Sequence, residues 1–456
     1  MQISRYSAPE FDPYGEARQT ETDVGWRAPV AAGPLASVVA VPGSKSLTNR
    51  ELVLAALADD HSTLHAPLWS RDSELMTEGL RALGTRFERM PGTGGFGDDV
   101  RVIPADELLG STTIDCGLAG TVMRFLPPVA ALGLGPTTFD GDEAARRRPM
   151  GASILGLRAL GVDIDDDGRG ALPFTVHGTG RVEGGALELD ASASSQFVSG
   201  LLLAAARFER GLDLRHTGER LPSLPHIEMT IVAMRARGVD VTTPEPGRWR
   251  VAPGPIHAID VTIEPDLSNA APFLVAAMIA GGHVTIAGWP AETTQVGAQL
   301  ADLLARFGGQ VSFDDDRLTV TAPPRGAGGG RGIRGVELDL SEAGELVPNL
   351  AALAAFADGP STLTGIGHIR HHETDRLAAL AAELNGLGGR VTELDDGLRI
   401  EPAPLHGGLW HAYADHRMAT TGAIVGLAVP GVVVDDIAST GKTLPQFPKL
   451  WEQMLA

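Results

Sequence analysis

The stretch at residues 42–50, Pro-Gly-Ser-Lys-Ser-Leu-Thr-Asn-Arg, combines a turn, two cations and several hydroxyl groups just before an apolar run at 52–57. The start of a helix offers unpaired backbone N–H groups and the positive end of the helix dipole, so this stretch suits a phosphate. It differs from a P-loop, because serine separates Gly43 from Lys45. An ordinary capped helix start with solvated Lys45 and Arg50 stays open as the alternative.

Polar residues also stand at the starts of five other apolar, helix-like runs. If these helices pack around common axes, several N-termini point into one space, which would attract anions strongly. Six unrelated N-caps are the alternative, but caps alone do not require cations at these positions. The residues concerned are Ser44, Lys45, Ser46 and Arg50; Gly120, Thr121 and Arg124; Ser194, Ser195 and Gln196; Ser268 and Asn269; Glu345; and His416 and Arg417.

The elements that carry these residues repeat. Each unit is a polar helix start, an Ala/Leu-rich helix, a Gly or Asp turn and a short β-branched strand, and a second helix ends in glycine within five of the gaps. A period of about 75 residues is too long for a solenoid and indicates duplicated α/β units. Pro127 and Pro128 should kink or restart the second of these helices. The first helices are expected at 46–57, 120–134, 195–208, 269–280, 345–357 and 417–429.

Composition limits the class of protein. The 456 residues are 43% hydrophobic, which is typical of a globular protein of two or three domains. A net charge of −20 argues against nucleic acid or an anionic membrane as partner, and no apolar run reaches transmembrane length. The single cysteine, Cys116, excludes an internal disulfide framework and favours a reducing, cytoplasmic location. Residues 1–29 read as a loosely ordered tail rather than a targeting peptide.

Six further segments carry recognisable chemistry: residues 118–124, 148–150, 194–197, 372–377, 415–419 and 442–445. Together with residues 42–50 they resemble the EPSP synthase (3-phosphoshikimate 1-carboxyvinyltransferase) family. The resemblance begins at about residue 36 and extends to the C-terminus.

The resemblance implies a mixed α/β fold, a two-domain inside-out α/β barrel built from six βαβαββ repeats, with the active site in the interdomain cleft. One domain, residues 43–262, is then inserted into the other, which combines residues 30–42 with 263–456. The implied reaction transfers the enolpyruvyl group of phosphoenolpyruvate to the 5-hydroxyl of shikimate 3-phosphate and releases phosphate through a tetrahedral intermediate. No cofactor is implied, no metal-ligand spacing is present, and we expect a monomer.

Two substrates with two phosphates and two carboxylates need a surplus of cations and hydrogen-bond donors. By resemblance, Arg376 and Arg417 hold the carboxylate of phosphoenolpyruvate. Its phosphate faces Lys45, Gly120, Arg148, Gln196 and Lys442, with Arg124 close by. Shikimate 3-phosphate is expected to contact Lys45, Ser46, Arg50, Ser194, Ser195, Gln196, Ser223, Glu345, His368 and His372.

The resemblance also implies acid–base roles. Glu345 stands where the family has its acidic base, and Glu373 and Lys45 match residues that move the proton at C3. Without the family, Glu345 reads equally as a carboxylate that stabilises a helix dipole, and Glu373 as a surface partner of an arginine.

Four positions depart from the family's usual residues. His372 replaces lysine, His368 replaces asparagine, His226 replaces tyrosine and Glu345 replaces aspartate. We hypothesise that a cationic His372 binds phosphate, so that affinity falls as the pH rises through the imidazole range. Gly120, without a side chain, is expected to leave room for the herbicide glyphosate.

Two other functions remain open. UDP-N-acetylglucosamine enolpyruvyl transferase shares the fold and donor, but usually carries a cysteine in the loop that corresponds to residues 141–149, and this chain has none there. A non-catalytic sensor of phosphorylated metabolites would gain nothing from Glu345 and Glu373 beside its anion sites.

Overall fold

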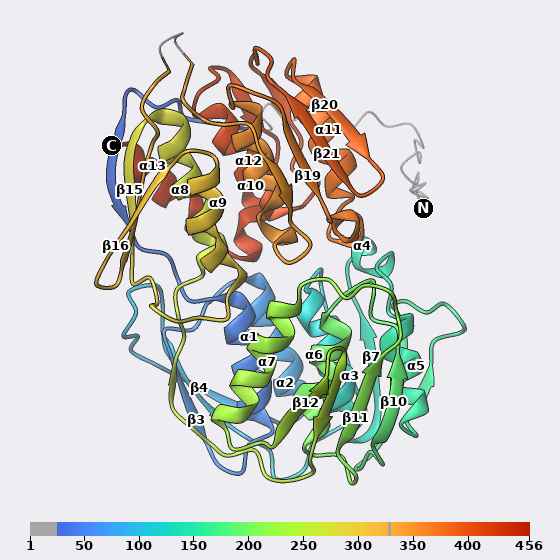
Figure 1. The fold of residues 1–456 in the computed structure, drawn as a ribbon. Coiled ribbons are helices and arrows are strands. Elements are labelled where there is room, and N and C mark those ends of the chain that lie inside the picture. Colours follow the sequence, from blue (N-terminus) through green and yellow to red (C-terminus); the bar gives the residue numbers. More distant parts are fainter. Residues whose placement is uncertain (1–24, 327–329) are drawn as a thin grey trace, which may run out of the picture.

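The computed structural model describes residues 25–326 and 330–456, which build two lobes, one above the other (Figure 1). Each lobe has its own hydrophobic core. In the lower lobe the core extends from Leu52 to Ile256 along the chain. In the upper lobe it combines residues from Ala28 to Val41 with residues from Leu267 to Met454. The upper lobe is therefore made of two separate parts of the sequence.

The lower lobe packs its helices in the middle and its strands outside (Figure 1). Its helices are α1 (Lys45–Ala56), α2 (Arg71–Ala82), α3 (Gly120–Ala130), α4 (Glu143–Arg146), α5 (Gly151–Ala159), α6 (Gln196–Ala205) and α7 (Leu224–Ala236). Its strands are β3 (Ser62–His65), β4 (Arg86–Met90), β5 (Asp99–Ile103), β6 (Thr112–Asp115), β7 (Leu134–Asp140), β8 (Asp163–Asp165), β9 (Phe174–Thr179), β10 (Gly185–Leu189), β11 (Leu212–His216), β12 (Val241–Glu245), β13 (Arg248–Val251) and β14 (Val261–Thr262).

The upper lobe has the same arrangement. Its helices are α8 (Leu267–Ala280), α9 (Leu300–Arg306), α10 (Val347–Ala355), α11 (Arg376–Gly386), α12 (His416–Gly426) and α13 (Phe447–Leu455), with short 3-10 turns η1 (Val296–Gln299), η2 (Gly344–Leu346), η3 (Gly367–His371) and η4 (Ile437–Lys442). Its strands are β1 (Trp26–Arg27), β2 (Leu35–Val39), β15 (Gly282–Ala287), β16 (Gln310–Asp314), β17 (Arg317–Thr321), β18 (Glu337–Asp339), β19 (Ser361–Thr364), β20 (Arg390–Leu394), β21 (Gly397–Glu401), β22 (Gly408–Trp410) and β23 (Val432–Val434).

The predicted sixfold repeat is confirmed by the strand order. The described strands form six separate sheets, five with four strands and one with three, and none of these closes into a barrel. In the sheet β6-β7-β9-β8, for example, β6 and β7 are parallel, and β9 lies antiparallel to both β7 and β8. The other four-stranded sheets repeat this pattern of one parallel and two antiparallel pairs.

The Ala/Leu-rich composition of the first helix in each repeat follows from its burial. Every residue of α3 and of α12 is buried, and so is every residue of α8 except its last. A helix that is buried on all sides needs apolar side chains all round rather than on one face. Small alanines also let these helices approach one another closely in the middle of each lobe.

The structure corrects two details of the sequence interpretation. Pro127 and Pro128 do not interrupt α3, which continues through both of them to Ala130. Each proline removes only its own N–H from the helix, so the loss is limited to the two hydrogen bonds that residues 127 and 128 would otherwise donate. Residues 1–24 of the predicted tail lie outside the described residues, but Trp26 and Arg27 form β1, which pairs with β23, so the folded chain begins before residue 30.

Two short segments of the chain connect the lobes, and they lie side by side. Ser44 N donates to the Glu264 carbonyl at 2.7 Å, and Asp266 N donates to the Pro42 carbonyl at 2.8 Å. These bonds hold residues 42–44 against 264–266, where the chain enters and leaves the lower lobe. The N-termini of α1 and α8 therefore start next to each other, at the junction of the lobes.

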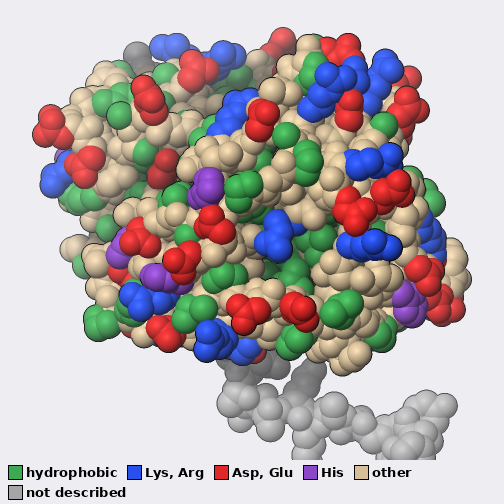
Figure 2. All heavy atoms as spheres, turned by 90° about the horizontal axis from the view of Figure 1, so that it is seen from below, with side chains coloured by type: hydrophobic (Ala, Val, Ile, Leu, Met, Phe, Trp, Pro, Cys, Tyr) green, Lys and Arg blue, Asp and Glu red, His purple; other side chains and the backbone are tan. Residues whose placement is uncertain are grey.

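Surface charge on the outer end of the lower lobe is mixed. Viewed from below, Lys and Arg side chains alternate with Asp and Glu side chains, with apolar side chains scattered between them (Figure 2). Among the described residues, no helix is both long enough and apolar enough to cross a membrane.

Close packing of α3 against α6 gives a stability prediction. A Cβ atom on Gly200 would lie 2.2 Å from the Arg124 carbonyl oxygen, which is backbone and cannot move aside. We expect Gly200→Ala to lower the free energy of unfolding by about 1–3 kcal/mol, measured by chemical denaturation. Gly156→Ala in α5 is the matched control, because its nearest neighbours are side-chain atoms at 3.5 Å or more. Equal stability of the two variants would contradict this packing.

Candidate active site

Helix N-termini from both lobes meet in one cavity at the lobe interface. α1, α3 and α6 contribute from below, and η2, α11 and α12 from above. This agrees with the predicted convergence for five of the six expected helix starts, which makes the cavity attractive to anions. Ser268 and Asn269 at the start of α8 line an adjacent cavity instead. The cavity is lined by Lys45, Ser46, Arg50, Thr121, Arg148, Ala193, Ser194, Ser195, Gln196, Pro222, Ser223, His226, Glu345, His368, His372, Glu373, Arg376, His416 and Arg417.

One carboxylate, Asp266, joins the starts of α1 and α8. Its side chain accepts hydrogen bonds from Lys45 N at 3.0 Å and from Asn269 N at 2.9 Å. Burial raises the pKa of Asp266, while these two backbone bonds and Arg417 act in the opposite direction. Asp266 thus fixes Lys45 of the lower lobe relative to the upper lobe.

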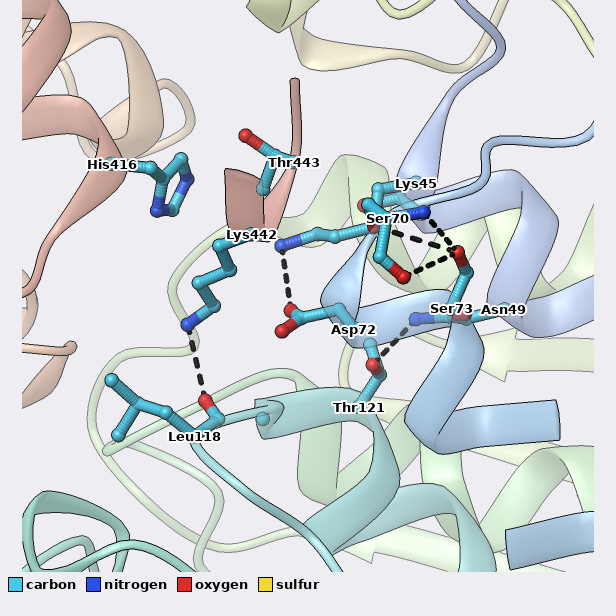
Figure 3. Close-up of polar contacts among 12 residues, drawn as sticks. Lys45, Asn49, Ser70, Asp72, Ser73, Leu118, Thr121, His416, Lys442 and Thr443 are labelled. Carbon is cyan, nitrogen blue, oxygen red and sulfur yellow. Dashed lines mark hydrogen bonds and ion pairs between the residues drawn. The ribbon is translucent and has the colours of Figure 1, made fainter. Parts of the chain in front are cut away.

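Two lysines approach the start of α3 from opposite lobes (Figure 3). Lys45 Nζ lies 3.5 Å from the carboxylate of Asp72, which is almost fully buried. Lys442 Nζ donates across the interface to the Leu118 carbonyl at 3.1 Å and pairs with Glu373. Leu118 therefore gives a cation of the upper lobe a direct anchor on the lower lobe.

A cradle of polar groups surrounds Gly120. A Cβ atom at this position would lie 3.0 Å from both Arg148 and Gln196 and 3.1 Å from Arg124. Arg148 donates to the Leu118 carbonyl at 3.2 Å, yet its Nε, the Nε of Arg124 and the Oε1 of Gln196 are buried without a hydrogen-bond partner. Buried polar groups are normally paired, so these unpaired atoms indicate a place for a polar ligand.

Arg376 is held by carboxylates on two sides. Asp415, fully buried, accepts from Arg376 Nε at 2.7 Å and from NH2 at 3.0 Å, which is a bidentate pair. Glu373 accepts from the same NH2 at 3.0 Å. Burial raises the pKa of Glu373, but Lys442 and Arg376 outweigh it and hold that pKa well below its usual range. Glu373 is therefore an ionised carboxylate between two cations.

His372 does not have the charge that the sequence-based hypothesis gave it. Arg376 NH1 lies 3.0 Å from His372 Nδ1, and because arginine only donates, Nδ1 must accept and carry no proton. Burial, followed by the charge of Arg376, lowers the pKa of His372 well below its usual range. The hypothesis of a cationic His372 is wrong, and the neutral ring offers only its Nε2–H to a ligand.

Glu345 faces the other end of the cavity. It accepts from Ser268 Oγ at 2.6 Å and lies 3.5 Å from Arg417 and 3.8 Å from His226 Nε2. Burial raises the pKa of Glu345, but His226, Arg417 and the Ser268 bond outweigh it and bring the pKa to about 2. Burial lowers the pKa of His226, so its imidazole is neutral at neutral pH and gains the charge that lowers the pKa of Glu345 only in more acidic solution.

Arg50 is almost completely buried and organises the wall beside Glu345. It donates to Thr230 Oγ1 at 2.8 Å, to the Ser46 carbonyl at 2.8 Å and to the His226 carbonyl at 2.9 Å. Burial lowers the pKa of Arg50 to about 9, so the side chain still carries its charge at neutral pH. Most of its donors are used within the protein, which leaves its charge as the main feature available to a ligand.

Most of the predicted site residues meet in this cavity. Gly120 and Lys442 are not in its lining but contact residues that are, as described above. Sequence reasoning did not single out Asp72, Asp266 or Asp415. Each stands at or near a helix start, which is the ordinary place for a capping carboxylate, and only the structure shows that they hold the cations of the site.

The arrangement can bind small polyanions and move protons. Unpaired donors and cations gather around Gly120, while two carboxylates, Glu345 and Glu373, and the neutral His226 stand within the same cavity. In the described part of the chain, no group of three or more His, Cys, Asp or Glu side chains is arranged to hold a metal ion.

Comparisons with known proteins agree on one family. A family model described as EPSP synthase (3-phosphoshikimate 1-carboxyvinyltransferase) matches residues 30–451. The chain is 57% identical over 435 residues to a 3-phosphoshikimate 1-carboxyvinyltransferase of Kocuria rhizophila, covering 94% of this chain and 96% of that protein.

Solved structures show the same fold at low sequence identity. EPSP synthase from Acinetobacter baumannii superposes with a TM-score of 0.76 at 23% identity, over 93% of this chain and 97% of the other. The enolpyruvyl transferase NikO from Streptomyces tendae gives a TM-score of 0.71 at 19% identity, over 93% and 96% of the two chains.

The low pKa of Glu345 gives a prediction for acid stability. A carboxyl whose folded pKa of about 2 lies below its unfolded value of 4.5 stabilises the fold above the higher value and loses that contribution as the pH falls. Between about pH 6 and pH 4, we expect the native protein to lose about 1 kcal/mol more of its free energy of unfolding than Glu345→Gln loses, because glutamine does not titrate. Parallel stability curves from denaturation at each pH would show that Glu345 titrates normally.

Proposed function

Because the chain belongs to the EPSP synthase family, we propose that its cavity transfers the carboxyvinyl group of phosphoenolpyruvate to the 5-hydroxyl of shikimate 3-phosphate and releases phosphate. The observation that carries this proposal is the cradle at Gly120. The buried Nε–H groups of Arg124 and Arg148 have no partner and lie beside Gly120, which supports an acceptor-rich ligand such as a phosphate there. The reaction is a step of the shikimate pathway, toward chorismate and the aromatic amino acids.

The donor occupies the cavity between the two lobes. Its phosphate faces Lys45, Gly120, Arg148, Gln196 and Lys442, which come from both lobes, so that binding favours the closed arrangement. Arg376 and Arg417 then hold its carboxylate. Their orientation is already fixed by Asp415, Glu345 and the Ser268 carbonyl, which limits the entropy lost on binding.

The acceptor lies along the α6 and α7 starts. Ser194, Ser195 and Gln196 cradle its 3-phosphate at the N-terminus of α6. Ser46, Arg50 and Ser223 orient its ring and carboxylate, while His368 and His372 close the cavity from above. The buried Nε2 of His368 has no partner within the protein and is available to the acceptor.

Proton transfers follow from the placement of the two carboxylates. Glu345, ionised at neutral pH, takes the proton of the acceptor hydroxyl while the hydroxyl oxygen bonds to C2 of phosphoenolpyruvate. Lys45, as an ammonium, gives C3 the proton that completes the tetrahedral intermediate, and the ionised Glu373 takes a proton from C3 as the bond from C2 to the phosphate oxygen breaks. Glu373 then returns that proton to Lys45, and the proton held by Glu345 passes to the departing phosphate. The negative charges of the bound substrates raise the pKa of both carboxylates and bring these pKa values closer to neutral pH, where a group can both take and release a proton.

We also propose the finer features that the family implies. The inserted domain covers residues 43–262, and the two separate hydrophobic cores support this division. The protein acts as a monomer in the cytoplasm, without a cofactor. Glyphosate competes for the donor site, since Gly120 leaves space beside Arg148 and Gln196.

Phosphate release from phosphoenolpyruvate tests the function directly. We expect release with shikimate 3-phosphate as acceptor and none with UDP-N-acetylglucosamine, because the latter is the acceptor of the sister enzyme. Release only with the sugar nucleotide would reassign the acceptor. Tight binding of shikimate 3-phosphate without any release would favour the sensor.

The acid–base roles predict a loss of turnover rather than of binding. Glu345→Gln and Glu373→Gln each remove one proton-transfer group, so kcat should fall by about 100- to 10,000-fold. Glu337→Gln, at an exposed position of β18, is the control and should retain native activity. If either site variant keeps more than about a tenth of the native kcat, that carboxylate does not transfer the proton.

A further inference from the structure

The turn immediately before α12 has an unusual backbone. Asp415 N donates to the Ala412 carbonyl at 2.9 Å, and the two residues between them, Tyr413 and Ala414, have φ values of 56° and 52°. A turn with positive φ at both central positions normally uses Gly, Asn or Asp, because a Cβ atom crowds the backbone in this region. A turn of this sequence persists only if the surrounding structure holds it.

Glu383 is the side chain that holds this turn. Its carboxylate accepts from Tyr413 Oη at 2.6 Å, from His411 N at 2.9 Å and from His411 Nδ1 at 3.1 Å. Asp435 adds one bond, from Ala412 N at 2.8 Å. Glu383 is only 7% exposed, whereas His411 is half exposed. Burial, followed by Glu383, raises the pKa of Tyr413 to about 12, so its hydroxyl remains a donor.

The turn leads directly into the donor site. Asp415, the next residue, caps α12 by accepting from Arg417 N at 2.8 Å and forms the bidentate pair with Arg376. Arg376 and Glu383 both belong to α11, seven residues or about two helical turns apart, and therefore lie on the same side of it. α11 thus contacts the segment 411–415 at two points, through Glu383 and through Arg376.

We propose that Glu383 is a positioning residue for the reaction: by holding the strained turn at Tyr413 and Ala414, it fixes Asp415 and so orients Arg376 and Arg417 toward the carboxylate of the donor. Glu383 itself does not touch the substrates. The inference rests on the proposed function, in which these two arginines bind phosphoenolpyruvate.

The test compares substitutions of Glu383 and Tyr413, which form the hydrogen bond that holds the turn, with a substitution that relieves the strain of the turn. Glu383→Gln places an amide against donors that need an acceptor, and Tyr413→Phe removes one hydrogen bond at a half-exposed position where the fold is not at risk. We expect each to raise the KM for phosphoenolpyruvate by about fivefold, the effect of one hydrogen bond, with the KM for shikimate 3-phosphate unchanged within about twofold. Glu401→Gln, on the exposed face of β21, is the control.

Rescue by glycine separates positioning from a general loss of stability. Glycine adopts positive φ without strain, so Glu383→Gln combined with Ala414→Gly should recover at least about half of the lost affinity for phosphoenolpyruvate. A merely structural role of Glu383 would lower the melting temperature and the activity without a selective change in one KM, and glycine would not restore it.

Each outcome either supports or overturns the positioning role of Glu383. A selective rise in the KM for phosphoenolpyruvate that glycine reverses supports the proposal. Three results in an active native enzyme would overturn the positioning role alone. The Glu383→Gln and Tyr413→Phe variants could keep the native KM, their KM values could rise equally for both substrates, or Ala414→Gly could fail to rescue Glu383→Gln. A native protein that releases no phosphate with shikimate 3-phosphate overturns the proposed function and this inference with it.

Discussion

Cations buried at the lobe interface are stabilised by carboxylates that lie beside them, and the rest of the structure depends on this pairing. Arg376, with Asp415 and Glu373 around it, is the central case. A buried charge without a partner would cost several kcal/mol, so removing Asp415, which forms the bidentate pair with Arg376, would endanger the fold as well as the site. Beside Gly120, by contrast, the Nε–H groups of Arg124 and Arg148 are buried without a partner. Binding selectivity thus follows from which cations the protein itself neutralises.

The repeat architecture explains how so many polar groups reach one place. Each repeat buries an apolar helix in the middle of its lobe and places its strands outside, so the helix ends are the parts that remain near the interface. Helix starts from both lobes reach the cavity, those of α1, α3, α6 and α7 from the lower lobe and those of η2, α11 and α12 from the upper lobe. The dipoles and unpaired N–H groups of these helices add to the field of Lys45, Arg148 and Arg417. Closure of the lobes is therefore part of the site, since Lys442 reaches Leu118 across the interface.

Histidines give this site a different electrostatic character from a lysine-rich one. His226, His368 and His372 all line the cavity, and burial lowers the pKa of each. Neutral imidazoles donate or accept hydrogen bonds without adding positive charge beside Arg50, Arg376 and Arg417. They limit cation repulsion in the substrate-free site while keeping polar groups ready for the acceptor.

The sequence by itself determined the local structure and the residue types of the site. The six helix–strand repeats and the glycines that end the second helices were predicted, because periodicity and capping residues depend on near neighbours in the chain. Most of the cavity lining was expected from the polar helix starts and from the resemblance to the family. Tertiary structure alone decided the charges and the partners. The sequence did not single out Asp72, Asp266 or Asp415 as partners of the cations, and it suggested a cationic His372, whereas the structure places Arg376 beside Nδ1 of His372. Glu383 lies 30 residues from Tyr413 in the sequence, and only the packing of α11 against the turn brings them together. Arg376 is only four residues from His372, but the burial that lowers the pKa of His372 and the contacts that hold the turn come from segments distant in sequence, which no local pattern encodes.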